Sequence, residues 1–466
     1  MLQLLAAIGL VTLSIFVHEL GHFLAARWRR LTVVRFSLIG LGNPIVTWRW
    51  RGVEYCICWL PIGAYVMIPQ LADLGALEGD LPPEQANLPP ASFSSKTLVA
   101  IAGPAANLVL ALVLACVVWQ VGYLVPAEYN RTEIGDISRE MVDSDGRTVP
   151  GPAAAADLRL GDVVQAIDGK AVSTFQDLVT GVLFGSQSDP DGRRYAILTI
   201  DRDGHVLTKK VYPVLVGIDR IRSIGVGPRS DLIVERVTPG SPAAEAGLLP
   251  GDQITAVDGS QLARREELRE YFQKRAGAPS VLTLKRGPQT ITATVRARPQ
   301  KIQGQEIYLI GVLWKIETVL VRKNPLEQFA DAYSQVFAAL SSIVNVRSDI
   351  GVRHMSGIVG IVDNLQQAAS AGVIPTLTFL ILINISLATF NLLPLPVLDG
   401  GHVVIAAITK LRGRPINPQI LFGTVKVCFL MLIGLIVYVS YNDIRRLVLG
   451  LAEEKAPAAA PAKPGK

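Results

Sequence analysis

Two histidines and a glutamate with the spacing of a zinc-binding helix stand near the start of the chain, in the segment HELGH at residues 18–22. A helix places residues i and i+4 on one face, so His18 and His22 can hold one Zn²⁺ while Glu19 reaches a metal-bound water. The chain has only five histidines, so chance is a poor explanation for this spacing. The alternative is a pair of structural histidines at the end of an apolar segment, where ionisable side chains are costly unless they serve a function.

Zinc hydrolases use a third protein ligand and leave the fourth position to water. The best candidate is Asp399, in the segment NLLPLPVLDGGH at residues 391–402. The two glycines after it allow a close approach of the backbone, and the two prolines before it break the preceding helix. We therefore expect an extended segment beside the metal. His402 is the competing ligand, but its position beyond the helix break favours a structural role.

The elements that must position these residues are membrane-spanning helices. Half of the 466 residues are apolar and only 18% are charged, and the mean hydropathy of +0.37 is that of a membrane protein. Four apolar runs are long enough to cross about 30 Å of hydrocarbon. They cover residues 2–26, 97–125, 372–395 and 421–441. The first run lacks the basic start of a signal peptide, and we interpret it as a retained span.

Basic residues set the orientation of these spans. Arg27, Arg29 and Arg30 follow the first span, and Lys410 and Arg412 lie between the third and the fourth. Both short loops are therefore expected on the cytoplasmic side, with HELGH near that side and the long insertion outside. The four cysteines form no disulfide framework, and a net charge of +6 without a basic cluster does not suggest nucleic-acid binding.

The insertion between the second and third spans contains a repeat. Segments 151–170 and 241–260 are identical at ten of twenty aligned positions. Each pattern predicts a short helix, a Gly-Asp turn and an alternating strand that ends in an Asp-Gly hairpin. We expect two small β-rich domains there. Apolar residues at helical spacing over 325–346 predict an amphipathic helix, either on the outer membrane surface or packed against the inserted domains.

The second repeat, with its string SPAAxAGLxxGDxIxxVDG, resembles a PDZ domain, and the first is a looser version. An HExxH in the first span, an LDG motif near a later span and two PDZ copies between them resemble the site-2 protease family. More closely, the chain looks like bacterial proteases of the regulator-of-sigma-E type. The resemblance covers nearly the whole chain, except the acidic segment at 70–95 and the C-terminal tail.

The resemblance implies a role for each site residue. His18, His22 and Asp399 are then zinc ligands, and Glu19 is the catalytic base. Asn391 is implied to bind the substrate backbone near the scissile bond. Its alternative role is to satisfy the carbonyls that the prolines free from the broken helix.

Three further segments match the family or depart from it. Asn107, in AGPAAN, matches a family motif, and we interpret it as a packing residue more than a catalytic one. Segment 51–69 is implied to be a membrane-embedded β-hairpin on the cytoplasmic side, whose edge pairs with an unwound substrate helix. The departure is SGIVG at 356–360, where the family has Ser-Gly-Pro-Val-Gly.

The predicted fold is a polytopic α-helical membrane protein with four transmembrane helices, a membrane-associated β-hairpin and two inserted PDZ-like domains. The expected regions are the first two spans with HELGH, two PDZ-like domains, a connector with the amphipathic helix, the last two spans and a disordered tail. Their bounds are 1–126, 127–222, 223–315, 316–371, 372–450 and 451–466.

The implied function is that of an intramembrane zinc metalloendopeptidase in the cytoplasmic (inner) membrane. It cleaves single-pass membrane proteins after another protease has shed their outer domain; anti-sigma factors and leftover signal peptides are the expected substrates. The periplasmic PDZ pair either binds an extended peptide or only excludes untrimmed substrates. One alternative is a catalytically inactive PDZ scaffold or membrane chaperone, which the intact HELGH and Asp399 disfavour. Another is a zinc enzyme that acts on a different bond, such as a lipid amide.

Overall fold

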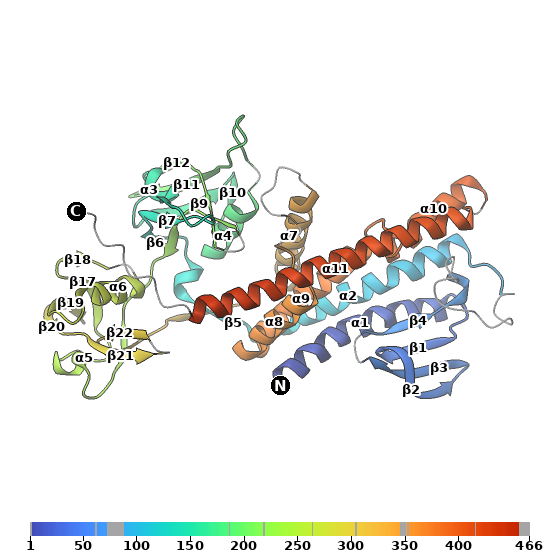
Figure 1. Cartoon of the computed structure of the whole chain (residues 1–466), viewed down its shortest axis with the longest axis horizontal. Coiled ribbons are helices and arrows are strands. Elements are labelled where there is room, and N and C mark those ends of the chain that lie inside the picture. The colour runs from blue at the N-terminus through green and yellow to red at the C-terminus, as the bar shows by residue number, and fades with distance from the viewer. Residues whose placement is uncertain are drawn as a thin grey trace. The chain divides into compact units, whose positions relative to one another are not determined.

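The structure is a computed structural model that divides into two compact units (Figure 1). It describes residues 2–60, 63–71, 88–185, 187–217, 220–262, 264–302, 305–344, 351, 354–414 and 416–455. The first unit comprises 1–123, 322–344 and 351–448, and the insertion 124–321 forms the second. Most of the acidic segment and the end of the predicted tail, from residue 456, lie outside the described residues.

Among the described residues, four helices of the first unit are long and apolar enough to cross a membrane. They are α1 (Leu2–Trp28), α2 (Phe93–Val121), α9 (Val373–Asn391) and α11 (Pro418–Lys455). These four helices confirm the number of spans expected from the sequence. The helix α11 also continues through Lys455, beyond the predicted start of the tail at 451.

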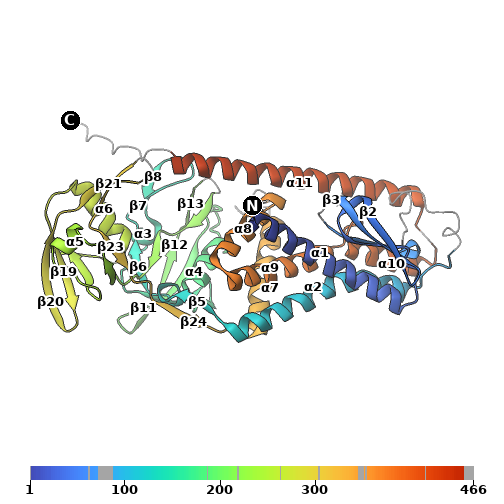
Figure 2. The same ribbon diagram turned by 90° about the horizontal axis from the view of Figure 1, so that it is seen from below.

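The helices α1 and α2 cross closely and lie side by side in both views (Figures 1 and 2). Gly21 of α1 makes this approach possible, because a Cβ at that position would lie 2.3 Å from the carbonyl oxygen of Ala102. The helix α9 packs along α2 on the same bundle. HELGH is therefore held directly against the first half of α2.

A four-stranded sheet follows α1, and it differs from the predicted hairpin. Its strands are β1 (Arg35–Ile39), β2 (Leu41–Trp50), β3 (Val53–Leu60) and β4 (Tyr65–Met67), in the order β2-β3-β1-β4. The predicted hairpin over 51–69 is wrong in its pairing, because β3 pairs with β2 and β4 pairs with β1. The turn at Arg51-Gly52, with both φ angles positive, joins β2 to β3. A short 3₁₀ helix, η1 (Pro69–Leu71), ends this region.

The connector between the insertion and the third span forms two helices, α7 (Pro325–Val344) and α8 (Ile358–Ala371). The predicted amphipathic helix exists as α7, but it packs against α2 and α9. The side-chain Nε2 of Gln328 donates to the carbonyl oxygen of Ala115 in α2 at 3.1 Å. The helix α7 therefore belongs to the helical bundle of the first unit. The helix α8, which the sequence did not predict, packs against α1 and α9.

The segment SGIVG forms the start of α8 and is capped by α11. The backbone N–H groups of Gly357 and Gly360 both donate to Oδ2 of Asp443 at 2.8 Å. A Cβ at either glycine would lie within 2.9 Å of this carboxylate, so a larger residue at either position would displace the Asp443 side chain from the cap. Ile358 is the first helical residue, where proline is also well accommodated. The departure from the family string is therefore compatible with the same cap.

The second unit contains two copies of one β-rich fold. The core sheets have the matching orders β10-β9-β11-β12 and β18-β17-β19-β20. The first copy consists of β6 (Ile134–Ile137), β7 (Glu140–Val142), β8 (Thr148–Pro150), α3 (Pro152–Ala155), β9 (Val163–Ile167), β10 (Lys170–Ala171), α4 (Phe175–Phe184), β11 (Ala196–Arg202), β12 (His205–Val211), β13 (Val214–Val216), β14 (Ile221–Ser223) and β15 (Val226–Pro228). The second consists of β16 (Val234–Val237), α5 (Pro242–Glu245), β17 (Gln253–Val257), β18 (Ser260–Gln261), α6 (Arg265–Arg275), β19 (Ser280–Arg286), β20 (Gln289–Val295), β21 (Arg298–Ile302), β22 (Gln305–Leu309) and β23 (Val312–Trp314).

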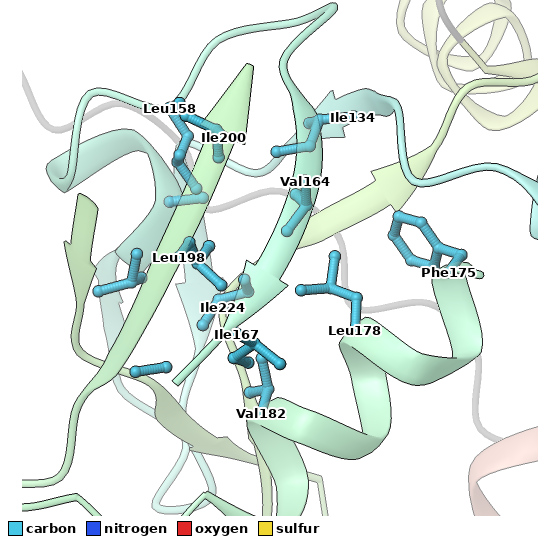
Figure 3. Close-up of a cluster of buried hydrophobic side chains, with 13 residues drawn as sticks. Ile134, Leu158, Val164, Ile167, Phe175, Leu178, Val182, Leu198, Ile200 and Ile224 are labelled. Atoms are coloured by element: carbon cyan, nitrogen blue, oxygen red, sulfur yellow. The ribbon is translucent and has the colours of Figure 1, made fainter. Parts of the chain in front are cut away.

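Each copy buries its own apolar core. In the first copy, isoleucines and leucines of the sheet meet the apolar face of α4 (Figure 3). The predicted domain boundary at 222/223 falls inside β14. The first copy extends beyond this boundary, because the next strand, β15, pairs with β6 of the same copy. At the base of the insertion, β5 (Tyr123–Pro126) and the short helix η2 (Ala127–Asn130) lie beside β24 (Thr318–Val321).

The buried aspartate of the repeat's Gly-Asp turn forms an ion pair in both copies. Asp162 and Asp252 are each 1% exposed. Arg202 donates to both oxygens of Asp162 at 2.7 and 2.8 Å, and Arg286 donates to both oxygens of Asp252 at the same distances. The aspartate is thus kept in both copies because it binds the end of a neighbouring strand.

Candidate metal centre

The two histidines of HELGH and Asp399 meet inside the first unit. His18 and His22 lie one turn apart on α1, each 7% exposed, and their Nε2 atoms are 3.1 Å apart. Asp399 Oδ2 lies 3.1 Å from Nε2 of His18, and Oδ1 lies 3.3 Å from Nε2 of His22. Three side chains that the sequence selected from distant segments therefore converge on one point.

The spacing of these atoms fits a zinc ion. A tetrahedral zinc with bonds of about 2.0–2.1 Å holds its ligand atoms about 3.3 Å apart. The two Nε2 atoms are 3.1 Å apart, and their contacts to Asp399, each with a different carboxylate oxygen, are 3.1 and 3.3 Å long. Two imidazoles and one carboxylate also form a common ligand set of catalytic zinc, with one position left for water. The residues present thus fit the metal that the sequence implied.

The loop and helix around Asp399 depend on two glycines. Asp399 is the first residue of α10 (Asp399–Arg412), so the prediction that it lies in an extended segment is wrong. The prolines interrupt the helix only as far as residue 398. An aspartate is favourable in the first turn of the helix that follows. A Cβ on Gly400 would lie 2.3 Å from the carbonyl oxygen of Leu392, and one on Gly401 would lie 2.0 Å from that of Leu395. Only glycines let α10 begin beneath this loop.

Glu19 lies beside the cluster and is held by the sheet. Its Oε2 accepts a hydrogen bond of 3.1 Å from the backbone N–H of Val66 in β4. The potential ligand atoms of His18, Glu19 and His22 all lie within 4.8 Å of one another. Asp399 forms its ion-pair contacts with His18 and His22. Glu19 is therefore placed next to the candidate metal position with one oxygen fixed by β4.

A cavity of about 650 Å³ opens onto these residues. It brings both further residues that the sequence singled out, Asn391 and His402, to the same space as Glu19. Asn391 is the last residue of α9, and His402 lies in the first half of α10. The other walls come from β4, α2, the loop before α10, and α11, through residues Tyr65, Val66, Ile68, Leu71, Lys96, Val99, Ala100, Pro396, Val397, Leu398, Val425 and Phe429.

Three positions of α2 touch the histidines, and sequence reasoning found only one of them. Val99 O lies 2.7 Å from Nδ1 of His22, and the side-chain Nδ2 of Asn107 lies 3.3 Å from Nδ1 of His18. Between them, a Cβ on Gly103 would lie 2.4 Å from Nε2 of His22. The three positions are four residues apart, a spacing that puts them on one face of a helix. That spacing around AGPAAN was the signal available in the sequence.

Comparison with known proteins decides the family. Residues 6–435 match the model of Peptidase family M50. The chain belongs to this family. The M50 chain is similar over almost its whole length to curated bacterial proteins: 27% identical to a putative zinc metalloprotease of Neisseria meningitidis (96% of this chain, 99% of the other), 28% to the regulator of sigma-E protease RseP of Escherichia coli (93% and 96%) and 30% to protease RseP of Yersinia pestis (96% and 99%).

The M50 chain is thus a zinc metalloprotease. Its relatives and its apolar helices indicate an intramembrane protease that crosses the membrane several times. The resemblance to regulator-of-sigma-E proteases is confirmed. Among solved structures, the PDZ domain of an SdrC-like protein from Listeria innocua is 25% identical to the M50 chain, covering 19% of this chain and 97% of that domain, with a TM-score of 0.17.

Proposed function

We propose that this chain cleaves transmembrane segments of single-pass membrane proteins with a zinc ion held by His18, His22 and Asp399. The observation that carries the proposal is the convergence of these three side chains to within 3.3 Å in a cavity that also contains Glu19. Glu19 is the base, and Asn391 binds the substrate backbone. The zinc supplies a Lewis acid that makes water nucleophilic at neutral pH and polarises the scissile carbonyl.

Glu19 moves the proton in this reaction. The Val66 N–H fixes one carboxylate oxygen, which leaves the other free to accept a proton from the attacking water. The same carboxyl group then donates this proton to the leaving amine. Peptide-bond hydrolysis is balanced by this single transfer, since the hydroxide forms the new acid and the proton leaves with the amine.

The sheet offers a backbone partner for an unwound substrate. A transmembrane helix satisfies its own amides, so its cleavage requires local unwinding and new hydrogen bonds. The strand β4 is an edge of the sheet, and Tyr65 and Val66 line the cavity. An extended substrate segment adds to this edge, as in other cases of strand addition. Asn391, across the same cavity, then binds a substrate carbonyl.

The inserted copies act on the substrate before it reaches the zinc. In the second copy, a cavity of about 270 Å³ lies along α6 and the strands β22 and β23. Its lining combines apolar residues such as Leu268 and Phe272 with the basic residues Arg265 and Arg269. This chemistry suits an extended PDZ-type ligand whose end is apolar and carries a carboxylate. A role as a size filter for untrimmed substrates remains the second proposal for the same unit.

The proposed substrates are membrane proteins of the anti-sigma-factor type and leftover signal peptides. The names of the relatives, regulators of sigma-E proteases, support the first class. The proposed location is the inner membrane, with the insertion on the periplasmic side and HELGH near the cytoplasmic side. The basic loops after the first span and before the last support this orientation.

Cleavage of a trimmed single-pass reporter by the purified full chain tests the proposal. We expect cleavage within the reporter's transmembrane segment, loss of cleavage after treatment with a zinc chelator, and recovery when zinc is returned. Cleavage that survives complete removal of zinc would overturn the proposal. A zinc-loaded protein that never cleaves this reporter, or any trimmed substrate offered, would favour the scaffold or chaperone function.

The role of the insertion is tested by excising it. The backbone N–H of Ala127 donates to the carbonyl oxygen of Glu317 at 2.8 Å, so the two ends of the insertion are adjacent. A short Gly-Ser linker can therefore replace residues 128–316. A size filter predicts that the excised protein cleaves the untrimmed reporter, whereas Arg269→Glu in the full chain leaves selection unchanged. If the insertion instead captures the substrate peptide, Arg269→Glu raises the KM for the trimmed reporter, and the excised protein still does not cleave the untrimmed reporter.

A further inference from the structure

The two histidines of HELGH are contacted by α2 through their second ring nitrogens. Nδ1 of His22 lies 2.7 Å from the backbone oxygen of Val99, and Nδ1 of His18 lies 3.3 Å from the side-chain amide of Asn107. The Nε2 atoms of both rings point to Asp399 instead. The helix α2 therefore supplies the partners of the two ring nitrogens that do not face Asp399.

The contact to Val99 determines the tautomer of His22. A backbone carbonyl can only accept a hydrogen bond, so the Nδ1 of His22 must carry the proton. In the neutral imidazole, Nε2 then carries the lone pair and is free to bind a metal. Metal-binding histidines typically donate their other N–H to such an acceptor, which fixes both the tautomer and the ring orientation.

The same requirement applies to His18, but its partner is an amide with two different ends. If the NH₂ group faces Nδ1, the proton of His18 lies on Nε2 and points to the metal position. If the oxygen faces Nδ1, the proton lies on Nδ1 and Nε2 is free. Among the described residues, the amide oxygen of Asn107 has no hydrogen-bond partner where it lies, although the side chain is fully buried. A half-turn about the Cβ–Cγ bond exchanges the two ends and gives this oxygen a donor.

We propose that Asn107 is a positioning residue whose amide oxygen accepts the Nδ1–H of His18 and so directs the lone pair of Nε2 to zinc. The proposal rests on the proposed function in one respect, because it takes His18 to be a zinc ligand. It gives the AGPAAN segment a chemical role in place of the packing role expected from the sequence. Val99 and Asn107 then act in the same way on the two histidines, one through a backbone carbonyl and the other through a side chain.

Zinc affinity of the full-length protein tests the proposal, measured by competition with a chelator of known affinity. Asn107→Asp keeps an acceptor of the same shape at Nδ1, whereas Asn107→Leu removes it. We expect Asn107→Leu to weaken zinc binding by about 10–100-fold, the usual effect of losing such a partner. Asn107→Asp is expected to remain within a few-fold of the wild type. A packing role predicts no change in zinc affinity for either variant.

Asn384 offers a matched control. It is also a fully buried asparagine in a span, and its Nδ2 donates to Ser14 Oγ in α1 at 3.1 Å. Asn384→Leu is expected to keep wild-type zinc affinity. The proposal is overturned if Asn107→Leu binds zinc as tightly as the wild type, if Asn107→Asp loses zinc as Asn107→Leu does, or if Asn384→Leu weakens zinc binding equally. Asn107→Ala replaces the leucine variant if that variant yields no folded protein.

His18→Ala distinguishes this inference from the proposed function. If His18→Ala binds zinc with wild-type affinity, His18 is not a ligand and the proposed function fails together with the inference. If His18→Ala loses zinc while Asn107→Leu does not, only the role of Asn107 is wrong.

Discussion

Asp399 lies against His18, with Oδ2 3.1 Å from Nε2, although the two residues stand near opposite ends of the chain. The contact exists because α1 and α10 both pack on α2. A ligand set divided between two segments so far apart is complete only when the first unit is folded. Zinc binding and correct packing of the spans are therefore expected to depend on each other.

Asp399→Ala tests this dependence. The variant loses the carboxylate among the three proposed ligands and leaves only the two imidazoles, so we expect it to contain less zinc per protein than the wild type. Measurement of metal content after dialysis checks the prediction. Asp363→Ala, which removes a half-buried carboxylate of α8 that accepts from Gln367, serves as the control and is expected to keep full zinc content. Unchanged zinc content in Asp399→Ala would show that Asp399 is not a ligand.

Gly103→Ala is expected to displace the rings of HELGH. Its Cβ would lie 2.4 Å from Nε2 of His22 and 2.9 Å from Cε1 of His18, distances that force a ring to move. We expect a lower zinc affinity with little change in helix content by circular dichroism. The control is Gly9→Ala, on the same helix as the histidines, where a Cβ would meet nothing within 4 Å. Equal zinc affinity in the two variants would contradict the close packing of α2 on the histidines.

The cap of α8 by Asp443 is predicted to stabilise the first unit. Asp443 is 2% exposed and accepts two backbone N–H groups, so Asp443→Leu leaves two part-buried donors without this partner. A fully buried donor left unpaired costs about 1–3 kcal/mol, which is the upper limit for each of these two. We expect a lower thermal unfolding temperature in detergent for Asp443→Leu and a smaller decrease for Asp443→Asn, which keeps an acceptor oxygen. Asn442→Leu, at the neighbouring half-buried position, is the control, and an equal decrease there would argue against the cap.

The second copy is predicted to lose stability in acid through Asp252. The Arg286 guanidinium holds the pKa of the Asp252 carboxyl below its ordinary value of 3.8. Because the folded-state pKa is the lower one, the stabilisation is present above about pH 4 and is lost as the pH falls through the folded-state pKa. Protection of the β17 and β19 amides from hydrogen exchange should decrease over that range in the full chain. In Asp252→Asn the protection is lower at pH 7 and this acid step is missing; an unchanged acid step would refute the assignment.

The sequence predicted the parts of the site that depend on residue type and helical spacing. HELGH required only that its segment be a helix, and Asp399 was recognisable from its proline and glycine neighbours. The parts that depend on packing were missed. Gly103 and Val99 act only because α2 crosses α1 at that point, and Asp443 caps α8 from a helix far along the chain.

The sheet shows a second limit of sequence reasoning. The strand β2 contains Pro44, is exposed along its whole length and lacks the alternation of a half-buried strand. The hairpin predicted over 51–69 does not include this strand, although it is the partner of β3. Similarly, the sequence does not show that α10 begins at Asp399, directly after the proline-rich break. The helix resumes there because Gly400 can pack closely against Leu392.

The central claim, a zinc protease with Glu19 as its base, is tested most directly by Glu19→Gln. Zinc content and cleavage of the trimmed reporter are to be measured on the same preparation. Glutamine keeps the shape of the side chain and an oxygen that can accept from Val66, but it cannot take a proton from water. We expect wild-type zinc content with cleavage reduced by at least about 10²–10⁴-fold, the usual contribution of a general base. Zinc-loaded Glu19→Gln that cleaves the reporter at the wild-type rate would contradict the account.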